Sequence, residues 1–406
     1  MLSVDEATAR VLDESRSLAA VEARLDKALG LVLAEAVASD VDSPPFDKAL
    51  MDGYAIVASD LVSGEATLEV LEEIAAGATP TKEVSSGFAT RIMTGAPMPR
   101  GADAVVMVER SSPIGATQVK LVDKPAKPGQ NWMARATAMQ RGEIVIKRGA
   151  VLRPMEIGLL AEVGKPTVSV FPTPTVSIVS TGNELVSIET QPGKGRIRNS
   201  NSSMLIAQCQ RVGAVPSALG IALDEEESLE TAFRRGFESD ILLISGGVSA
   251  GRFDLAPKVL ESLGATNCFR QVFLKPGKPL WFGYLDRDGR RTLIFGLPGN
   301  PVSSLVCFEL FVAPAIRRLQ GHPPSPPAIR KVFLATPWTH RSDRPTYHPA
   351  SIIYDAQRGE FLATPLNWKG SADLRTLSLA DGLVCFPPGE VSYGAGESVG
   401  VILLVA

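Results

Sequence analysis

The sequence predicts a multidomain α/β protein. Its central three-layer domain, with a mostly parallel sheet, is flanked by β-rich domains and by an N-terminal helical and linker region. The chain has 406 residues, too many for one ordinary hydrophobic core. Apolar strand-like runs alternate with helix-like runs between residues 174 and 322, which indicates right-handed βαβ units. Two other regions are rich in Val, Ile and Thr with frequent Gly and Pro, which is typical of β-structure.

The boundaries between domains follow from changes in residue pattern along the chain. Ser3 and Glu6 have the spacing of a capping box, which predicts a helix at the start. Pro154 predicts the start of another helix after the first β-rich region, and the segment HPPSPP forms a proline-rich linker. The predicted parts are a helical and linker domain of residues 1–45 and 145–173, a β-rich domain of residues 46–144, a three-layer α/β domain of residues 174–322, and a C-terminal β-barrel-like domain of residues 330–406.

In the central domain, apolar strands lead into helices through polar or glycine-containing turns. The strands are predicted in TVSIVST, DILLIS and RTLIFGL. The helices are predicted in SNSSMLIAQCQR, ESLETAFRRGFES, FDLAPKVLESLG and the segment that follows FGLPGNP. This alternation predicts a parallel sheet with helices packed on it.

Composition and charge argue against several classes of protein. The formal net charge is −3, with 41 basic and 44 acidic residues, so no overall positive field favours nucleic acid. The four cysteines lack metal-binding spacing and the three histidines form no HExxH cluster, which argues against a zinc hydrolase. The N-terminal segment is acidic without an apolar core, and no apolar run approaches the ~20 residues of a membrane span. We therefore expect a cytoplasmic protein without a nucleic-acid or membrane partner.

Three polar loops follow the predicted strands of the central domain. In open α/β sheets, ligands bind beyond the carboxyl ends of the strands. Glycine lets the backbone approach an anion, and helix N-termini present free N–H groups. Each loop alone is more simply explained as a tight turn, but three loops at one end of a sheet favour an anionic or nucleotide ligand. The residues that we expect to bind the substrate are Ser180, Thr181, Gly182, Ser245, Gly246, Gly247, Ser249, Gly251, Pro298, Gly299, Asn300 and Pro301.

Charged side chains near these loops are candidates for binding an oxyanion and a metal ion. In KPGKP, two prolines restrict the positions of Lys275 and Lys278, which suits an oxyanion, although a solvated turn explains the segment equally well. Glu184, Asp224 and Asp254 are candidate ligands of Mg²⁺, which prefers hard oxygen ligands and substrate phosphates. Capping of a helix N-terminus is the simpler explanation for Asp224 and Asp254.

Several stretches distributed along the whole chain form a more specific pattern than any single loop. They are PPFDKALMDGYAI, RIMTGAPMPRGADAVVMVE, VSIVSTGNELV, GRIRNSNSSML, LLISGGVSAG, FLKPGKPLWFG and FGLPGNPVSS. Together, and in this order, they resemble the MoeA family of molybdopterin molybdotransferases, which includes the E domain of gephyrin.

The resemblance implies a reaction, a metal ion and an assembly. Mg²⁺-assisted cleavage of the phosphoanhydride in adenylylated molybdopterin would accompany insertion of molybdate, with AMP and molybdenum cofactor as products. The resemblance also implies an elongated four-part subunit and a homodimer. It suggests molybdopterin adenylyltransferase and molybdoenzymes as partner proteins.

The resemblance assigns roles to individual residues as well. From its own neighbours, Asp52 indicates only a turn, because Asp-Gly is a turn signal. The positions that match those of the family are Lys275, Lys278, Arg344 and Ser371 for molybdate, Asp52, Asp224 and Asp254 for catalysis, and Thr94 for the substrate.

The chain departs from the family's pattern where acidic residues are usual. Thr137 and Ala138 stand in place of a Glu and an Asp, and Arg252 stands where an acidic residue is common. Three hypotheses stay open: an active molybdotransferase, a non-catalytic carrier or scaffold that binds molybdopterin or its cofactor, and a nucleotide-handling enzyme. The β-rich regions argue against the third, because such enzymes need only the central domain. Loss of the acidic segment favours the second hypothesis, whereas retention of Asp52, Asp224, Asp254 and KPGKP favours the first, which we prefer.

Overall fold

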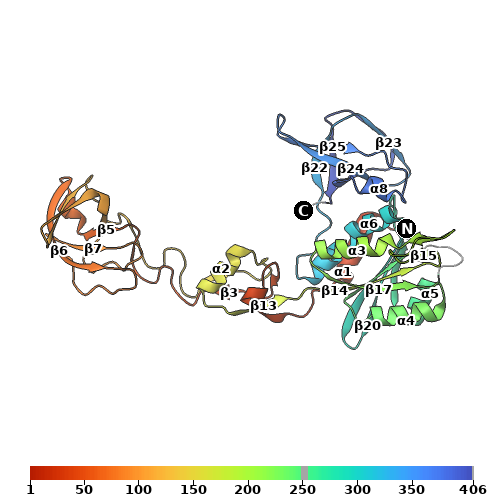
Figure 1. Cartoon of the computed structure of the whole chain (residues 1–406), viewed down its shortest axis with the longest axis horizontal. Helices are drawn as coiled ribbons and strands as arrows, with labels where there is room; N and C mark the ends of the chain where they lie inside the picture. Colours follow the sequence, from red (N-terminus) through yellow and green to blue (C-terminus); the bar gives the residue numbers. More distant parts are fainter. Residues whose placement is uncertain (248–254, 405–406) are drawn as a thin grey trace. The chain divides into compact units, whose positions relative to one another are not determined.

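The computed structural model describes residues 1–247 and 255–404 (Figure 1). The chain forms two compact units, which are described separately. Unit 1 comprises Met1–Glu22, Leu31–Ala34 and Ser169–Ala406, and unit 2 comprises Ala23–Gly30 and Glu35–Val168. The finer division into four domains stays a prediction.

Unit 2 is built around a six-stranded sheet with the strand order β8-β5-β7-β6-β10-β9. Neighbouring strands run antiparallel except β6 and β7, which are parallel. The core of this sheet includes Tyr54, Ile56 and Leu68, all buried. The sheet strands are β5 (Gly53–Ile56), β6 (Glu65–Ile74), β7 (Phe88–Ile92), β8 (Ala104–Met107), β9 (Ser111–Ile114) and β10 (Gln118–Val122).

Shorter elements complete unit 2. The short strands form the pairs β3–β12 and β4–β11. The bounds are η1 (Leu25–Lys27), β3 (Val37–Ala38), β4 (Lys48–Ala49), η2 (Ala58–Leu61), η3 (Val108–Arg110), β11 (Trp132–Met133), β12 (Ile144–Ile146) and α2 (Pro154–Glu162).

Two helix starts predicted from the sequence are confirmed. Helix α1 (Val4–Glu14) begins with a capping box, in which Ser3 Oγ accepts from the amide of Glu6 and Glu6 Oε2 accepts from the amide of Ser3. Helix α2 begins with Pro154 in its first turn, where the missing amide hydrogen costs the helix nothing. Both helix starts therefore depend on residues close together in the sequence and do not require contacts with distant segments.

The centre of unit 1 is a six-stranded sheet with the order β17-β14-β18-β21-β20-β19. The four strands β17, β14, β18 and β21 are parallel, whereas β20 and β19 are antiparallel. The predicted mostly parallel sheet is therefore confirmed. The strands are β14 (Thr175–Thr181), β17 (Val215–Ala222), β18 (Ile241–Ser245), β19 (Thr266–Gln271), β20 (Pro279–Arg287) and β21 (Arg290–Leu297).

Helices cover both faces of this sheet, as the predicted three-layer arrangement requires (Figure 1). Alternate residues of β18 point to opposite sides: Leu243 packs with α1, α3 and the α6–α7 segment, and Leu242 and Ile244 pack with α4 and α5. The helices are α3 (Ser200–Arg211), α4 (Glu226–Gly236), α5 (Ala256–Ser262), α6 (Pro301–Cys307) and α7 (Ala313–Leu319), and the π-helical turn η4 (Phe308–Val312) joins the last two.

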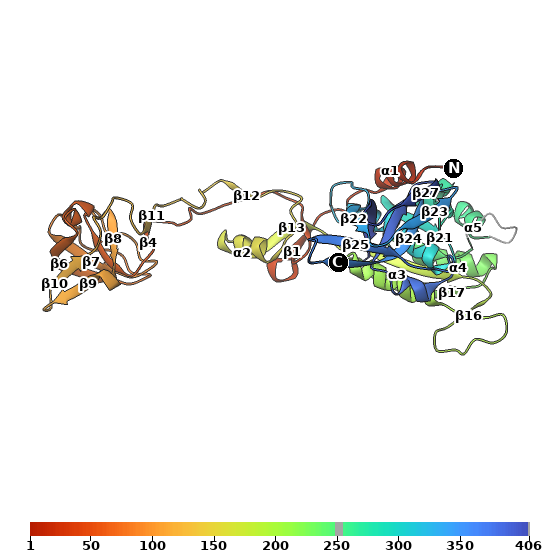
Figure 2. The same cartoon turned by 90° about the horizontal axis from the view of Figure 1, so that it is seen from above.

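The last strands of the described chain form a closed barrel with the order β22-β25-β24-β26-β28. Figure 2 labels β22, β24 and β25 of this barrel. Its buried residues include Val332, Ala350 and Phe386. Strands β23 and β27 form an antiparallel pair beside it. The bounds are β22 (Arg330–Leu334), β23 (Trp338–Ser342), β24 (Thr346–Asp355), β25 (Glu360–Pro365), α8 (Leu374–Leu377), β26 (Gly382–Phe386), β27 (Gly389–Tyr393) and β28 (Ser398–Leu403).

The remaining strands are short, and they are β1 (Val21–Arg24), β2 (Val32–Leu33), β13 (Thr167–Phe171), β15 (Leu185–Val186) and β16 (Ile197–Arg198).

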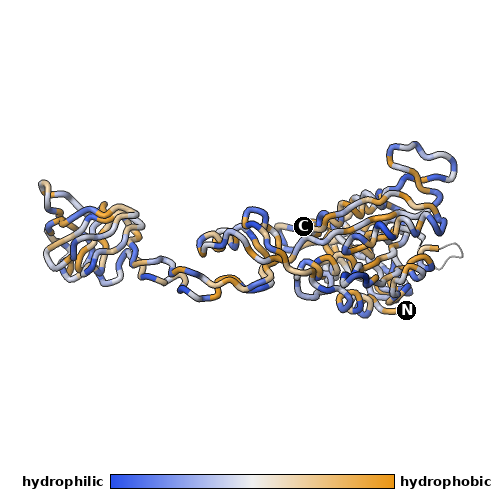
Figure 3. The backbone as a smooth tube through the Cα atoms, turned by 90° about the horizontal axis from the view of Figure 1, so that it is seen from below, coloured by the Kyte–Doolittle hydropathy of each residue, from blue (hydrophilic) through white to orange (hydrophobic). Residues whose placement is uncertain are grey.

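Apolar and polar stretches alternate along the chain (Figure 3). No helix in its described part is long and apolar enough to cross a membrane. The cysteines are free thiols; Cys209 and Cys307 are buried, whereas Cys268 and Cys385 are partly exposed.

Candidate functional site

The carboxyl ends of three neighbouring parallel strands meet at one edge of the central sheet. Strand β14 ends at Thr181, β18 at Ser245 and β21 at Leu297. The register pairs Ser245 with Ser180 on one side and with Leu297 on the other. The amide of Gly246 donates to the carbonyl of Leu297 at 3.0 Å. The predicted convergence of the three loops is therefore confirmed, and their role in binding stays a prediction.

A cleft of about 720 Å³ opens at this edge of the sheet. Ser180 is buried behind it, where its hydroxyl donates to Asn199 Oδ1 at 3.0 Å. Ser249 and Gly251 lie outside the described residues. The predicted loop residues that line the cleft are Thr181, Gly182, Ser245, Gly246, Gly247, Pro298, Gly299, Asn300 and Pro301.

Two glycines after β18 are required by the close approach of the chain to itself. Gly246 and Gly247 have φ angles of +94° and +64°. A Cβ atom on Gly246 would lie 2.6 Å from the backbone oxygen of Thr181, and one on Gly247 would lie 2.4 Å from the Thr181 hydroxyl. Only glycine lets the loop pass this near the end of β14. These glycines therefore serve the packing of the loops as well as any approach of a ligand.

Sequence reasoning missed two asparagines that border the cleft. Asn199 is the N-cap of α3, and its Oδ1 accepts from the amide of Ser202. Asn201 Nδ2 donates to Ser245 Oγ at 2.9 Å and to the carbonyl of Gly299 at 2.8 Å. Both residues lie in the stretch GRIRNSNSSML, where two amide side chains at a predicted helix start were the available signal. Asn201 therefore ties together the loops that follow β18 and β21.

Two of the three predicted metal ligands line the same cleft. Glu184 follows β14 and Asp224 precedes α4; the Asp224 amide donates to Asn183 Oδ1 at 3.3 Å. Mg²⁺ commonly takes one or two carboxylates together with substrate phosphates, so these residues fit that ion. Within residues 1–247 and 255–404, no group of three or more His, Cys, Asp or Glu is placed to hold a metal. Asp254 lies outside this part of the chain, and Mg²⁺ binding stays a prediction.

Two of the predicted molybdate-binding residues, Lys275 and Arg344, lie where the segment before β20 runs beside the start of the barrel strand β24. Lys275 continues the barrel's hydrogen bonding beside β24: its amide donates to Pro345 O, and its carbonyl accepts from the Tyr347 amide. Arg344 Nη1 donates to the Leu274 carbonyl at 3.2 Å. These contacts hold Lys275 and Arg344 on adjoining segments. Their role in binding molybdate stays a prediction.

The other two residues predicted to bind molybdate lie nearer to the cleft. Lys278 is exposed and immediately precedes Pro279, which lines the cleft. The Ser371 carbonyl accepts from the amide of Val302 in the first turn of α6 at 3.0 Å, and the neighbouring Ala372 also lines the cleft. The rim of the cleft therefore includes segments from both the central domain and the barrel.

Asp52 and Thr94 lie together in unit 2. Asp52 Oδ1 accepts from the Thr94 amide at 2.7 Å and from the Thr94 hydroxyl at 2.8 Å. The hydrogen bond from the Thr94 amide is the largest cause of a lowered Asp52 pKa, and it stabilises the carboxylate. The carboxylate therefore joins the turn before β5 to the turn after β7, and its catalytic role stays a prediction.

The uncharged positions Thr137 and Ala138 lie in the loop between β11 and β12 of unit 2, and both are exposed. The Thr137 hydroxyl donates to the Ala134 carbonyl at 2.6 Å, and the Ala138 amide donates to the Ser43 carbonyl at 2.8 Å. The nearby Arg135 pairs with Asp42 at 2.6 Å. The Arg135 amide also donates to Asp47 Oδ1 at 2.8 Å, so the loop is held by backbone carbonyls and by two carboxylates.

Comparison with known families matches most of the chain. Residues 2–164 match the family described as "MoeA N-terminal region (domain I and II)". Residues 177–318 match "Probable molybdopterin binding domain", and residues 331–404 match "MoeA C-terminal region (domain IV)".

Individual relatives match over nearly the whole length. A molybdopterin molybdenumtransferase of Staphylococcus aureus (strain COL) is 32% identical over 410 residues, covering 99% of this chain and 95% of that protein. One of Bacillus subtilis (strain 168) is 33% identical over 415 residues, covering 99% and 94%. The crystal structure of a molybdopterin biosynthesis MoeA protein from Pyrococcus horikoshii has a TM-score of 0.83 and 31% identity, with 100% of both chains covered.

Proposed function

The chain belongs to the MoeA family of molybdopterin molybdenumtransferases, and on that premise we propose that it inserts molybdate into adenylylated molybdopterin in a Mg²⁺-dependent reaction that releases AMP. The observation that carries the proposal is the cleft in which three strand-end loops meet two carboxylates and the segment that bears Lys278. This arrangement offers donors to phosphate oxygens and carboxylates to a metal ion at one place. The proposal includes a homodimer in the cytoplasm, which receives substrate from molybdopterin adenylyltransferase and supplies cofactor to molybdoenzymes.

In this proposal, the chain's residues position a highly charged substrate. Backbone amides of the loops after β18 and β21 hold the phosphoanhydride, because oriented N–H groups stabilise charge that develops on leaving oxygens. Glu184, Asp224 and Asp254 hold Mg²⁺, which would neutralise charge on the phosphate oxygens. Lys275, Lys278, Arg344 and Ser371 bind molybdate. For Asp52 we propose a catalytic role, and for Thr94 a contact with the substrate.

Release of AMP by the purified protein tests the proposal directly. The protein is given adenylylated molybdopterin, Mg²⁺ and molybdate, and a cofactor-free molybdoenzyme reports the active product. We expect Asp224→Asn to lower the rate of AMP release at least about tenfold, because a carboxylate beside the phosphates is lost.

Glu225→Gln is the matched control for that variant. Glu225 is adjacent and exposed, and its side chain does not cap α4. Equal rates of AMP release in Asp224→Asn and in the unmodified protein would contradict the role of Asp224. No AMP release from the unmodified protein would contradict the proposed reaction.

A second candidate function is a carrier or scaffold that binds molybdopterin or its cofactor without turnover. The observation that favours it is the absence of carboxylates at Thr137 and Ala138. Tight binding of the pterin without AMP release would support this candidate over the transferase.

A further inference from the structure

The orientation of one buried amide is fixed by its neighbours. Asn201 is only 7% exposed. One side-chain atom of Asn201 lies 2.8 Å from the carbonyl oxygen of Gly299, which can only accept, so that atom is Nδ2. The second Nδ2 hydrogen is donated to Ser245 Oγ at 2.9 Å. Oδ1 is therefore left as a pure acceptor; it is buried within a residue that lines the cleft, and it has no hydrogen-bond partner among the described residues.

The hydroxyl of Thr181 is a second unpaired polar group at the same cleft. Thr181 is 3% exposed, and its Oγ1 also has no partner within the described part of the chain. This hydroxyl lies against Gly247, close enough that a Cβ there would be 2.4 Å away. Leaving a buried polar group without a partner costs free energy, so unpaired groups at a cleft indicate where a ligand completes the hydrogen bonding.

The chemistry of these atoms restricts what the ligand presents to them. Fully ionised phosphate and molybdate oxygens can accept hydrogen bonds but cannot donate them, and Asn201 Oδ1 can only accept. Asn201 Oδ1 therefore needs an N–H or O–H of the ligand, whereas Thr181 Oγ1 can accept or donate. A phosphate oxygen therefore cannot pair with Asn201 Oδ1, and in this proposal the phosphates bind where backbone amides and cations are available.

We propose that Asn201 Oδ1 and Thr181 Oγ1 form a subsite that accepts hydrogen bonds from an uncharged N–H or O–H group of the substrate. This inference rests on the proposed function, which supplies two sources of such groups. One is the amino and ring N–H edge of the pterin, and the other is the adenylate, through its amino group or ribose hydroxyls. The subsite distinguishes the heterocycle or sugar from the phosphates and so fixes the direction in which the substrate lies.

Thr181→Val is the variant that tests the subsite most cleanly. Valine has nearly the shape of threonine and removes only the hydroxyl, which makes no hydrogen bond with the described residues. The added methyl lies against a glycine, so the packing is kept. We expect unchanged thermal stability and a dissociation constant that rises about 3- to 10-fold for the ligand that donates to the hydroxyl. Thr181→Ser, which keeps the hydroxyl, should bind nearly as the unmodified protein does.

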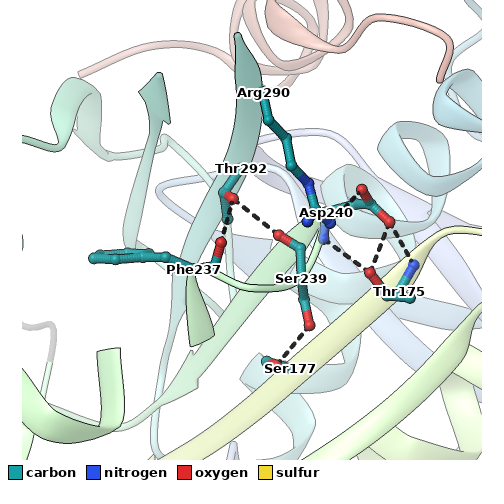
Figure 4. A network of polar contacts seen from close by, with 7 residues as sticks. All are labelled: Thr175, Ser177, Phe237, Ser239, Asp240, Arg290 and Thr292. Carbon is teal, nitrogen blue, oxygen red and sulfur yellow. Dashed lines mark hydrogen bonds and ion pairs between the residues drawn. The ribbon is translucent and has the colours of Figure 1, made fainter. Parts of the chain in front are cut away.

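Ser177→Ala is the matched control on the same strand, β14. Ser177 lies toward the opposite end of the sheet, where its hydroxyl is 2.7 Å from that of Ser239 (Figure 4). Removing this paired hydroxyl should lower stability and leave ligand binding unchanged. The two variants therefore separate a hydroxyl that binds the ligand from one that holds the fold.

The source of the hydrogen bond is identified by calorimetric titration of the full-length protein with two probes, AMP and pterin-6-carboxylate. Purine riboside 5′-monophosphate lacks the amino group of AMP, and the 2′- and 3′-deoxy forms of AMP each lack one ribose hydroxyl. Lumazine-6-carboxylate has an oxo group instead of the 2-amino group of the pterin and carries an additional N–H at N1. The analogue that lacks the relevant donor should bind Thr181→Val and the unmodified protein equally, because the coupling is then absent. Inorganic phosphate should not distinguish the two proteins.

Each outcome bears on the subsite alone. Weaker binding of one probe, with the difference lost in one of its analogues, supports the subsite and names its source. Equal binding of both probes by Thr181→Val and the unmodified protein overturns it. Because binding is measured without turnover, absence of AMP release contradicts the proposed reaction and leaves this result unaffected.

Discussion

The two ends of the central sheet use similar polar side chains in opposite ways. At the amino end, Asp240 Oδ2 accepts from the amide and hydroxyl of Thr175, at 2.8 and 2.7 Å, and Oδ1 is 2.9 Å from Arg290 Nη2 (Figure 4). The hydroxyl of Thr292 donates to the carbonyl of Ser239 at 2.9 Å. At the carboxyl end of the same strands, Thr181 Oγ1 and Asn201 Oδ1 have no partner among the described residues.

The difference teaches how to separate structural from functional polar groups. At the amino end, the polar groups of Thr175 and Asp240 pair with one another, although a cavity of about 670 Å³ adjoins Asp240 and Arg290. At the carboxyl end, glycines let the loops approach one another, and Thr181 Oγ1 and Asn201 Oδ1 have no partner among the described residues. A cavity alone therefore does not identify the binding end of this sheet. Unpaired polar groups in residues that also line a cleft favour the carboxyl end.

The largest expected effect comes from breaking the amino-end network with Asp240→Ala. The change leaves the Thr175 amide and hydroxyl without their acceptor, and we expect a loss of about 3 kcal/mol in the free energy of unfolding. Urea unfolding measures this loss. Arg290→Ala should cost much less, because the Arg290 side chain is 50% exposed and its charge is well hydrated.

The comparison between the two ends would fail in either of two ways. The first contradicting result would be that Asp240→Ala destabilises the protein no more than Arg290→Ala does. The second would be that the folded Asp240→Ala variant binds AMP markedly less tightly than the unmodified protein.

The second-largest expected effect is that of Gly247→Ala, at the carboxyl end of the central sheet. The left-handed φ of +64° and the contact with the Thr181 hydroxyl should together lower the free energy of unfolding by about 1–2 kcal/mol. The new methyl group also displaces the hydroxyl, so binding of the probe that identifies the subsite should weaken at least as much as in Thr181→Val. Calorimetry and urea unfolding measure the two effects.

Gly299→Ala is the control for stability at the same cleft. A Cβ on Gly299 would meet nothing closer than 3.7 Å, so the free energy of unfolding should change by less than about 0.5 kcal/mol. If Gly247→Ala were as stable as Gly299→Ala, the packing reason given for Gly247 would be wrong.

The smallest effect is the acid dependence of α8, whose Leu374 lines the rim of the cleft. Asp373 caps this helix, and hydrogen bonds from Thr376 and from the Lys369 amide lower its pKa to about 2. Because the folded pKa is lowered, the charged form contributes stability above the usual pKa of 3.8, and that contribution is lost as the pH falls through about 2.

Asp373→Asn keeps a capping oxygen and removes the charge, so it isolates this effect. Acid unfolding of both proteins should show a small stability difference at pH 5 that shrinks toward pH 2. A difference that stays constant across this range would show that the carboxylate charge does not contribute to the cap.

Local and periodic features of the fold were predictable from the sequence. The capping box at Ser3 depends on residues three apart, and the strand DILLIS is apolar at every position but its first and last, as a strand covered on both faces must be. The convergence of the three loops was also predictable from the sequence, because parallel strands place their carboxyl ends at one edge of the sheet.

Other features of the candidate site were not predictable from sequence. The role of Asn201 in joining the loops after β18 and β21 depends on partners 44 and 98 positions away along the chain. No periodicity or local spacing encodes such contacts. The pairing of Asp52 with Thr94, 42 positions away, was missed for the same reason.

The sequence by itself determined the alternation of strands and helices, the parallel sheet and the family, because these depend on residue periodicity and on ordered motifs. Only the tertiary structure decided which polar groups at the ends of that sheet are satisfied. Thr175 and Thr181 are the same residue type on one strand, yet one hydroxyl is paired with Asp240 and the other has no partner among the described residues. A hydrogen bond requires two atoms about 3 Å apart, and that distance is set when remote segments of the chain pack together.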